Sequence, residues 1–233
     1  MLEALRAEVL EANLELVRRG LVIYTFGNAS AIDRASGLVV IKPSGVPYEK
    51  MTAADMVIAD LDCKIVEGKL RPSTDLDTHV ALYRAFPTIG GVAHTHSRHA
   101  TAWAQARRDI PCFGTTHADY FHGPVPVTEP LTAEEIDADY EANTGLAIVR
   151  RLSGSDPLGC PAVLVAGHAP FCWGKSVTEA VHTAVIVEEL AAMAWQTLTI
   201  NPQAEPISRS LHEKHHFRKH GPTATYGQSQ TAR

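Results

Sequence analysis

The apolar run at residues 89–93 ends in the triplet His94-Thr95-His96, and this pattern constrains the fold more than any other in the chain. Alternate residues of a strand point to the same face, so both imidazoles lie on one side, roughly 6.6 Å apart along the strand. Ring nitrogens at that spacing can converge on one divalent ion at about 2.0–2.1 Å. The sequence therefore predicts a strand whose end carries two metal ligands.

Two further positions offer ligands of the same kind. A second candidate strand, 162–165, is followed closely by His168, and Asp75 lies in a Pro-Ser-Thr-Asp loop. Three nitrogens and one carboxylate suit Zn²⁺, with Mn²⁺ or Co²⁺ as alternatives. A histidine taken alone is more often a satisfied polar residue, so it is the combination of two strand ends that favours a metal site.

Composition narrows the class of protein. The 233 residues are 45% hydrophobic, which suits one α/β domain with a large core. The net charge of −5 argues against a nucleic-acid partner, because phosphate backbones bind a surplus of Lys and Arg. The four cysteines form no C-x-x-C pair, which favours a reducing cytoplasm, and no apolar stretch is long enough to predict a signal peptide or a membrane partner.

Helical and strand patterns alternate along the chain. Apolar spacing predicts a helix over residues 2–19, and apolar runs predict strands at 21–24 and 38–41. Segments 56–60 and 64–67 indicate a hairpin.

Capping patterns mark the starts of the remaining helices. They lie at Thr52, Asp77, Ser97, Thr132 and Ser176, and a last helix is expected over 207–219. We expect a single domain over residues 1–228 and a polar tail at 229–233. The domain is predicted to hold a central mixed, largely antiparallel sheet sandwiched between helical layers.

Glycine and hydroxyl residues gather in three loops that could hold a small anion. Gly27-Asn28, Ser44-Gly45 and Ser73-Thr74 supply donors, and Lys42 adds a positive charge beside the second loop. Pro43 ends strand pairing, and the glycine after it permits a turn that exposes backbone N–H groups. No G-x-G-x-x-G or G-x-x-x-x-G-K-[ST] sequence occurs, so neither a dinucleotide nor ATP is implied.

Asp119 lies in a polar segment after the short apolar run 110–113. Taken alone, it is either a helix cap or turn former or a general base.

Six motifs in this order resemble the epimerase branch of the class II aldolase/epimerase superfamily, over residues 1 to 228. They are Gly27-Asn-Ala-Ser30, Ile41-Lys-Pro-Ser-Gly45, Pro72-Ser-Thr-Asp75, His94-Thr-His-Ser-Arg-His99, Gly114-Thr-Thr-His-Ala-Asp-Tyr120 and Tyr226-Gly-Gln228. The epimerase branch is favoured because Asp75 stands where aldolases typically have glutamate, and because Asp119 and Tyr226 are both in place.

The resemblance implies a divalent metal, usually zinc, held by Asp75, His94, His96 and His168. It implies a homotetramer of C4 symmetry in which Asp119 and Tyr226, the acid/base pair, reach a metal held by the neighbouring subunit. The substrate would be a ketopentose phosphate. Its binding residues would be Gly27, Asn28, Lys42, Ser44, Gly45, Ser73, Thr74, Thr115 and, more weakly indicated, His215.

The implied reaction is the interconversion of L-ribulose 5-phosphate and D-xylulose 5-phosphate. The hydrogen on C4 is not acidified by the C2 carbonyl, so inversion requires retro-aldol cleavage of the C3–C4 bond through a metal-bound enediolate. Asp119 and Tyr226 would handle the proton of the C4 oxygen. Their pKa values would have to move toward neutrality, that of Asp119 upward through burial and that of Tyr226 downward near the metal.

Other functions remain open at this point. An aldolase would share the enediolate, although Asp75 and Tyr226 argue against it, and a 4-epimerase of another ketose phosphate is not excluded. A non-catalytic partner-binding module is disfavoured because every implied ligand is present. A zinc hydrolase is disfavoured because no H-E-x-x-H helix occurs.

Two departures from the family pattern concern the site. Thr74 replaces a serine and keeps its hydroxyl, and Ala169 stands where glycine is common. Alanine disfavours positive φ, so the turn that carries His168 is expected to be adjusted.

Overall fold

A seven-stranded sheet forms the centre of the computed structural model, which describes residues 1–220 and residue 224. The strand order is β4-β3-β2-β1-β5-β7-β6, and every neighbouring pair is antiparallel. The strands are β1 (Asn28–Asp33), β2 (Leu38–Ile41), β3 (Val57–Ala59), β4 (Ile65–Glu67), β5 (Gly91–His94), β6 (Ala162–Leu164) and β7 (Pro170–Gly174). An isolated parallel bridge joins Val127 to Leu164 of the edge strand β6, so the sheet is mixed only at this edge.

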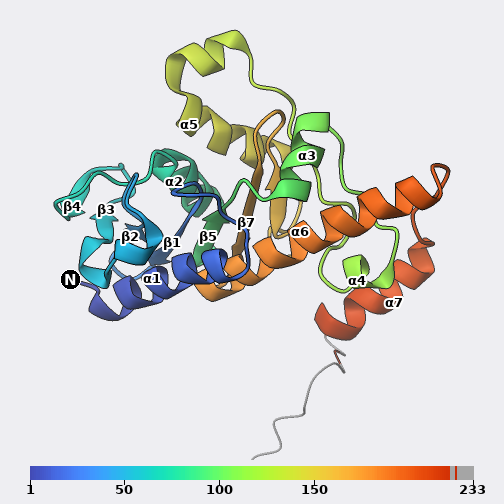
Figure 1. Ribbon diagram of the computed structural model, residues 1–233, viewed down its shortest axis with the longest axis horizontal. Coiled ribbons are helices and arrows are strands. Elements are labelled where there is room, and N and C mark those ends of the chain that lie inside the picture. Colours follow the sequence, from blue (N-terminus) through green and yellow to red (C-terminus); the bar gives the residue numbers. More distant parts are fainter. Residues whose placement is uncertain (221–223, 225–233) are drawn as a thin grey trace, which may run out of the picture.

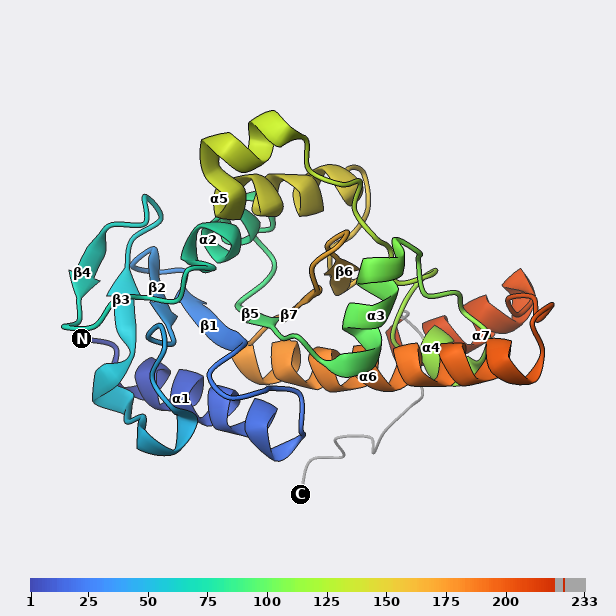
Figure 2. The same ribbon diagram turned by 45° about the horizontal axis from the view of Figure 1, so that its top comes forward.

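Helices cover both faces of this sheet, as Figures 1 and 2 show. Helices α2 and α5 lie on one face, α1 and α6 lie on the other, and α4 and α7 pack together beside the C-terminal half of α6. The helices are α1 (Glu3–Arg18), α2 (Leu76–Ala85), α3 (Arg98–Ala106), α4 (Thr115–Ala118), α5 (Ala133–Arg151), α6 (Val177–Ile200) and α7 (Arg209–His220), with short 3₁₀ turns η1 (Tyr48–Lys50) and η2 (Ala53–Asp55). The predicted α/β fold is confirmed.

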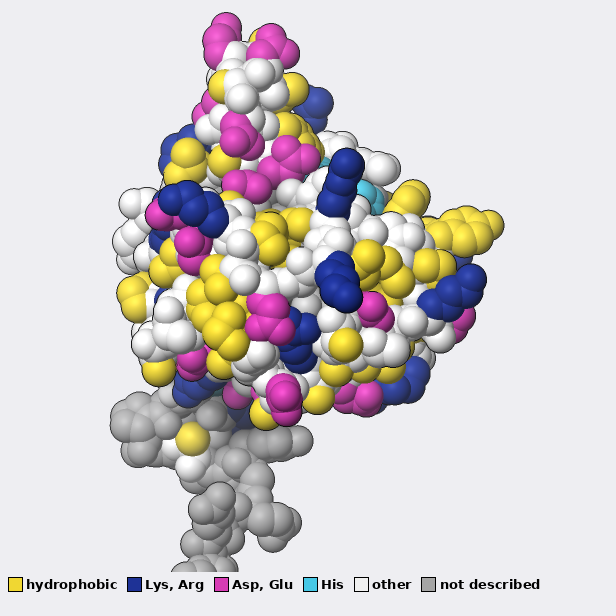
Figure 3. All heavy atoms as spheres, turned by 90° about the vertical axis from the view of Figure 1, so that its left-hand side faces the viewer, with side chains coloured by type: hydrophobic (Ala, Val, Ile, Leu, Met, Phe, Trp, Pro, Cys, Tyr) yellow, Lys and Arg dark blue, Asp and Glu magenta, His cyan; other side chains and the backbone are white. Residues whose placement is uncertain are grey.

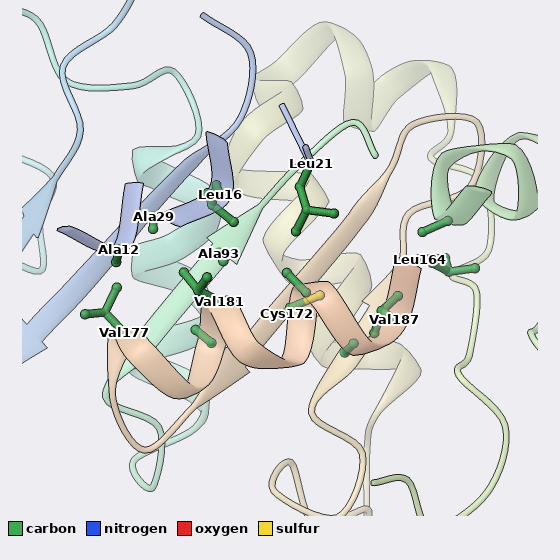
Figure 4. Packing of buried hydrophobic residues seen from close by; sticks show 14 of the residues in the cluster. Ala12, Leu16, Leu21, Ala29, Ala93, Leu164, Cys172, Val177, Val181 and Val187 are labelled. Atoms are coloured by element: carbon green, nitrogen blue, oxygen red, sulfur yellow. The ribbon is translucent and has the colours of Figure 1, made fainter. Parts of the chain in front are cut away.

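Strand alternation divides the core into two layers. Val40, Ala93 and Cys172 join the cluster under α1 and α6, whereas their neighbours Val39 and Val92 join the cluster under α2 and α5. Figure 4 shows the first cluster, in which α1 and α6 meet the sheet through small and branched side chains. Both faces of the central strands are therefore buried, and β2 is a continuous apolar run as a result.

Helix α6 begins unusually close to the sheet. A Cβ added at Gly91 on β5 would lie 2.3 Å from the Cα of Val177, the first residue of α6. Glycine at this position therefore permits a close approach that any side chain would block. This contact sets the start of the longest helix against the strand that ends in His94.

Several sequence predictions hold and others fail. The strand at 38–41, the hairpin at β3 and β4, and the capping box of Thr132 with Glu135 are all confirmed. Residues 21–24 are not a strand, because Phe26 N–H closes a turn onto the Ile23 carbonyl and Tyr24 has a φ of 52°.

The start of α2 was also misplaced. Asp77 lies inside the first turn of that helix, and Asp75 occupies the N-cap position. Strands β1 and β7 were missed. Both contain small, polar or proline residues in addition to apolar ones, so neither shows the apolar run used to predict strands.

The surface in Figure 3 is mostly mixed in character, with hydrophobic and charged side chains interspersed. Acidic side chains gather at the top of this view, over the projecting α5, which carries Glu134, Glu135, Asp137, Asp139 and Glu141. Within the part of the chain that the structure describes, no helix has the length and apolar character needed to cross a membrane.

Candidate functional site

Three histidines from two segments of the chain converge beside the end of strand β5. His94 ends β5, His96 follows two residues later, and His168 lies in the turn between β6 and β7. One ring nitrogen from each lies within 4.8 Å of the other two, and the Nε2 atoms of His96 and His168 are 3.2 Å apart. The antiparallel pairing of β5 with β7 brings these segments together, since His94 stands opposite Phe171.

Burial favours the neutral form of His96 and His168. Burial lowers the pKa of His168 to about 4 and also lowers the pKa of His96. The Nδ1–H of His94 donates to the Pro170 carbonyl at 2.9 Å, which leaves its Nε2 as the unprotonated nitrogen. Neutral ring nitrogens with free lone pairs are the form that binds a metal, so the residues present fit a divalent ion.

Asp75 lies in the same cavity, immediately before α2. Its Oδ2 accepts hydrogen bonds from Asn28 Nδ2 at 2.6 Å and from Ser73 Oγ at 3.3 Å. Burial raises the pKa of this carboxyl, but the nearby His94 and His79 and the Asn28 hydrogen bond outweigh it, and the pKa lies below the usual value. The compact group within 4.8 Å contains the three histidines and not Asp75.

Backbone hydrogen bonds join two further loops that line the cavity, residues 42–45 and 71–74. The Ser44 N–H donates to the Arg71 carbonyl and the Ser73 N–H donates to the Lys42 carbonyl, each at 2.9 Å. The Ser44 amide is therefore paired within the protein. This pairing places the Ser44-Gly45 and Ser73-Thr74 hydroxyl loops side by side.

Lys42 is almost fully buried beside these loops, with 2% of its surface exposed. Its Nζ donates to the Pro43 carbonyl at 3.2 Å and lies 4.8 Å from the centre of the Tyr48 ring. Burial lowers the pKa of Lys42 to about 8, while Asp75 acts in the opposite direction. A buried ammonium group without a carboxylate in hydrogen-bond contact is available to an anionic ligand.

These groups line one cavity of about 340 Å³, a size suited to a small polar molecule. It contains every predicted binding residue of the three loops, together with Lys42 and the four predicted metal ligands. The Oδ1 of Asn28 is buried and accepts no hydrogen bond from the described residues. An unpaired buried acceptor facing a cavity is suited to a ligand hydroxyl.

Glycine is required at two turns around the cavity. Gly27 has a φ of 78°, and a Cβ there would lie 2.9 Å from the His94 carbonyl oxygen. Gly167, just before His168, has a φ of 74°. Ala169 does not have a positive φ, so the alanine is accommodated in the His168 turn without strain.

The remaining predicted residues lie elsewhere in the chain. Asp119 follows α4, and its carboxylate pairs with Arg218 at 2.9 Å, His215 Nδ1 at 3.2 Å and Lys219 at 3.4 Å, all on α7. Neither Asp119 nor His215 nor Thr115 lines the cavity. Tyr226 and the tail at 229–233 lie outside the described residues.

The ionisation of Asp119 also differs from the expectation. Burial favours a raised pKa, but the hydrogen bonds from Arg218 and His215 and the charge of Lys219 outweigh it. The pKa of Asp119 therefore lies below its ordinary value in the isolated chain.

Four residues that line the cavity were not predicted as site residues: Thr25, Phe26, Tyr140 and Glu141. The last two, Tyr140 and Glu141, lie in α5 where the helix is broken at Asp139, with φ −167° and ψ 96°. Asp139 is a residue type favoured at helix N-caps, but it lies within the longer helix predicted from the capping box at Thr132, so the break was not predicted. A larger hollow of about 720 Å³ between α1 and α6 contains none of the predicted residues.

Comparisons with known proteins agree with this geometry. Residues 7–195 match the family described as class II aldolase and adducin N-terminal domain. The L-ribulose-5-phosphate 4-epimerase UlaF of Salmonella paratyphi B is 55% identical over 97% of this chain and 100% of its own length.

Solved structures show the same fold. An L-fuculose 1-phosphate aldolase superposes with a TM-score of 0.78 at 24% identity, covering 91% of this chain and 94% of its own. An aldolase II superfamily protein from Pseudomonas syringae has a TM-score of 0.77 at 16% identity, covering 95% and 88%. The β5 and β6–β7 histidines thus occupy a fold that these proteins share.

Proposed function

The chain belongs to the class II aldolase and adducin N-terminal domain family, and we propose that it is a metal-dependent 4-epimerase of L-ribulose 5-phosphate and D-xylulose 5-phosphate. The observation that carries the proposal is the cavity in which three convergent imidazoles face two hydroxyl loops and a buried lysine. The high identity to UlaF over nearly the whole chain supports the choice of reaction and substrate.

The metal site in this proposal comprises His94, His96 and His168, with Asp75 as a fourth ligand. Zn²⁺ is favoured because it commonly binds imidazole nitrogens together with a carboxylate. Mn²⁺ and Co²⁺ are the alternatives, since they also accept this set of ligands. When bound, such an ion supplies Lewis-acid stabilisation of negative charge that develops on the substrate oxygens.

The loops bind and orient the substrate. Lys42, with the Ser44 and Ser73 hydroxyls, would hold the phosphate through charge-assisted hydrogen bonds. Asn28 Oδ1 would accept from a sugar hydroxyl, since it is buried and has no hydrogen-bond donor among the residues that the structure describes. These contacts hold the phosphate end of the sugar, next to the C4 centre that changes configuration.

The chemical step breaks and re-forms the C3–C4 bond. One acid/base group removes the proton of the C4 hydroxyl as the bond breaks and an aldehyde forms. The aldehyde turns, C3 attacks its other face, and the second group protonates the new C4 oxygen. We assign these roles to Asp119 and Tyr226, because epimerisation needs one proton-transfer group for each of the two positions of the C4 oxygen.

Asp119 and Tyr226 would serve the cavity of a neighbouring copy in a C4 homotetramer. The position of Asp119 supports this arrangement, because it lies outside the cavity of its own chain. A location in the reducing cytoplasm is also part of the proposal, and it is supported by four cysteines that form no disulfide.

Turnover of L-ribulose 5-phosphate by metal-loaded and chelator-treated protein tests the proposal. We expect metal-dependent formation of D-xylulose 5-phosphate without net release of glycolaldehyde phosphate. The Asp119→Asn and Tyr226→Phe variants should lose most turnover. Net cleavage would instead indicate an aldolase, and full turnover by both variants would refute their assigned roles.

A further inference from the structure

Helix α5 is broken at the point where it reaches the cavity. Asp139 has extended backbone angles, and its Oδ1 accepts from the Ala142 N–H at 3.0 Å. This is the contact of an N-cap, so a second helical segment begins at Tyr140. The break thereby places Tyr140 at the first position of a capped segment.

That second segment is held firmly against α2. Thr78 Oγ1 donates to the Glu141 carbonyl at 2.6 Å. One turn further on, a Cβ added at Gly145 would lie 2.5 Å from the Cβ of Ala81, so the two helices are in close contact. Tyr140 is consequently carried by a fixed element, although it lies at an irregular point of the chain.

The Tyr140 hydroxyl contacts His168 at Nδ1, the ring nitrogen that does not face His96. Its oxygen lies 2.9 Å from Nδ1 of His168, and the two rings are nearly parallel at 27° with centres 6.0 Å apart. The opposite nitrogen of the same ring, Nε2, is the one that faces His96.

The two nitrogens of a neutral imidazole have opposite roles. If Nε2 is to direct a lone pair toward a metal, Nδ1 must carry the proton and donate it to an acceptor. His94 follows this pattern with the Pro170 carbonyl as acceptor. For His168, the acceptor is the Tyr140 hydroxyl.

We infer that Tyr140 is a positioning residue for the metal site, because its hydroxyl holds His168 in the tautomer and orientation that present Nε2 to the ion. The inference rests on the metal site of the proposed function. A metal-binding histidine often donates a hydrogen bond from the ring nitrogen that does not bind the metal. Removing the acceptor of that hydrogen bond typically weakens metal binding by about 10- to 100-fold.

The test measures Co²⁺ binding to metal-stripped protein by competition with a chromophoric chelator, together with the visible absorption bands of the bound ion. Tyr140→Phe removes the hydroxyl and keeps the ring. Tyr24→Phe is the matched control, because Tyr24 is 89% exposed and does not line the cavity. We expect about 10- to 100-fold weaker Co²⁺ binding and altered bands for Tyr140→Phe, with no change for Tyr24→Phe.

A double-mutant comparison keeps the inference falsifiable if Tyr140→Phe also alters the fold. In a His168→Ala background, Tyr140→Phe should cause no further loss of Co²⁺ affinity, because its effect passes through His168. An equal loss in both backgrounds, or wild-type affinity and bands in Tyr140→Phe, would overturn the inference.

The outcomes also separate this inference from the proposed function. Wild-type protein that binds no Co²⁺ would overturn both. Wild-type protein that binds Co²⁺ but does not convert the pentulose phosphates would overturn only the epimerase assignment.

Discussion

At the scale of single residues, Lys42 is unusual because its ammonium group is buried beside the cavity. It lies beside two loops that carry hydroxyl groups. Among the described residues, its ammonium group donates to carbonyl oxygens and lies over an aromatic ring. Burying an ammonium group costs free energy unless a partner is supplied. Lys42 is therefore expected to contribute more to substrate binding than to stability.

Replacing this lysine should separate the two contributions. In Lys42→Met the KM for the pentulose phosphate should rise by about 10- to 100-fold, because a charged hydrogen bond is worth about 1.5–3 kcal/mol. The free energy of unfolding should stay constant or increase. Steady-state kinetics and urea denaturation measure the two effects. The exposed Lys50→Met is the control, and an unchanged KM in Lys42→Met would contradict the assignment.

Single-residue patterns predicted most of this cavity. Histidines at strand ends and hydroxyl residues beside glycine and lysine are chemically distinctive within a few positions of sequence. Tyr140 has no such signature, because it becomes part of the site only through the break at Asp139. That break depends on packing against α2, which local sequence does not report.

At the scale of elements, the contact between β5 and α6 is the tightest constraint near the histidines. Gly91→Ala would push a methyl group into the backbone of Val177. We expect a loss of about 3 kcal/mol or more in the free energy of unfolding, since overpacking against backbone cannot relax easily. Chemical denaturation checks this value.

Gly114→Ala is the matched control for that substitution. Its φ is −153°, and an added Cβ would meet no atom within 4 Å. It should change stability by less than about 1 kcal/mol. Equal effects of the two substitutions would show that the approach of α6 to β5 is not rigid.

The elements that sequence predicted well are those with strong local signals. The capping box at Thr132 and the β-branched run of β2 depend on neighbouring residues only. β1 was missed and residues 21–24 were wrongly predicted as a strand, because the first contains small and polar residues and the second is apolar. Residues 28–33 form strand β1 because they pair with both β2 and β5, which is a tertiary effect that local sequence does not show.

At the scale of the whole molecule, stability should depend on pH through a buried histidine. Burial lowers the pKa of His117 to about 4, and its Nε2–H donates to the Gly123 carbonyl at 3.0 Å. The unfolded chain binds this proton near pH 6.5, so between about pH 6.5 and 4 the unfolded state binds more protons. The free energy of unfolding should therefore fall by up to about 3 kcal/mol as pH is lowered across this range.

Urea denaturation at a series of pH values, with chelator present throughout, checks this expectation. His117→Gln should reduce the slope between pH 6.5 and 4, because glutamine does not titrate, while other histidines whose pKa is lowered by burial, such as His168, still contribute. His182→Gln replaces an exposed histidine and should leave the slope unchanged. A wild-type slope in His117→Gln would assign the acid sensitivity to other groups.

The fold class was predictable because it follows from alternating patterns along the whole chain. The separation of Asp119 from the histidines was not predictable from composition or spacing, since it depends on how α4 and α7 pack beside α6. The resemblance alone pointed to it.

The salt-bridged position of Asp119 on the α4–α7 unit has a genetic consequence. Under the proposed division of roles, a His94→Ala chain would keep its acid/base residues and an Asp119→Asn chain would keep its metal ligands, so each would fail alone for a different reason. Co-assembled in equal amounts into a cyclic tetramer, the two should complement each other, with about a quarter of the sites joining both sound halves. Turnover assays on the refolded mixture would detect this recovery, and its absence would confine the whole reaction to one chain.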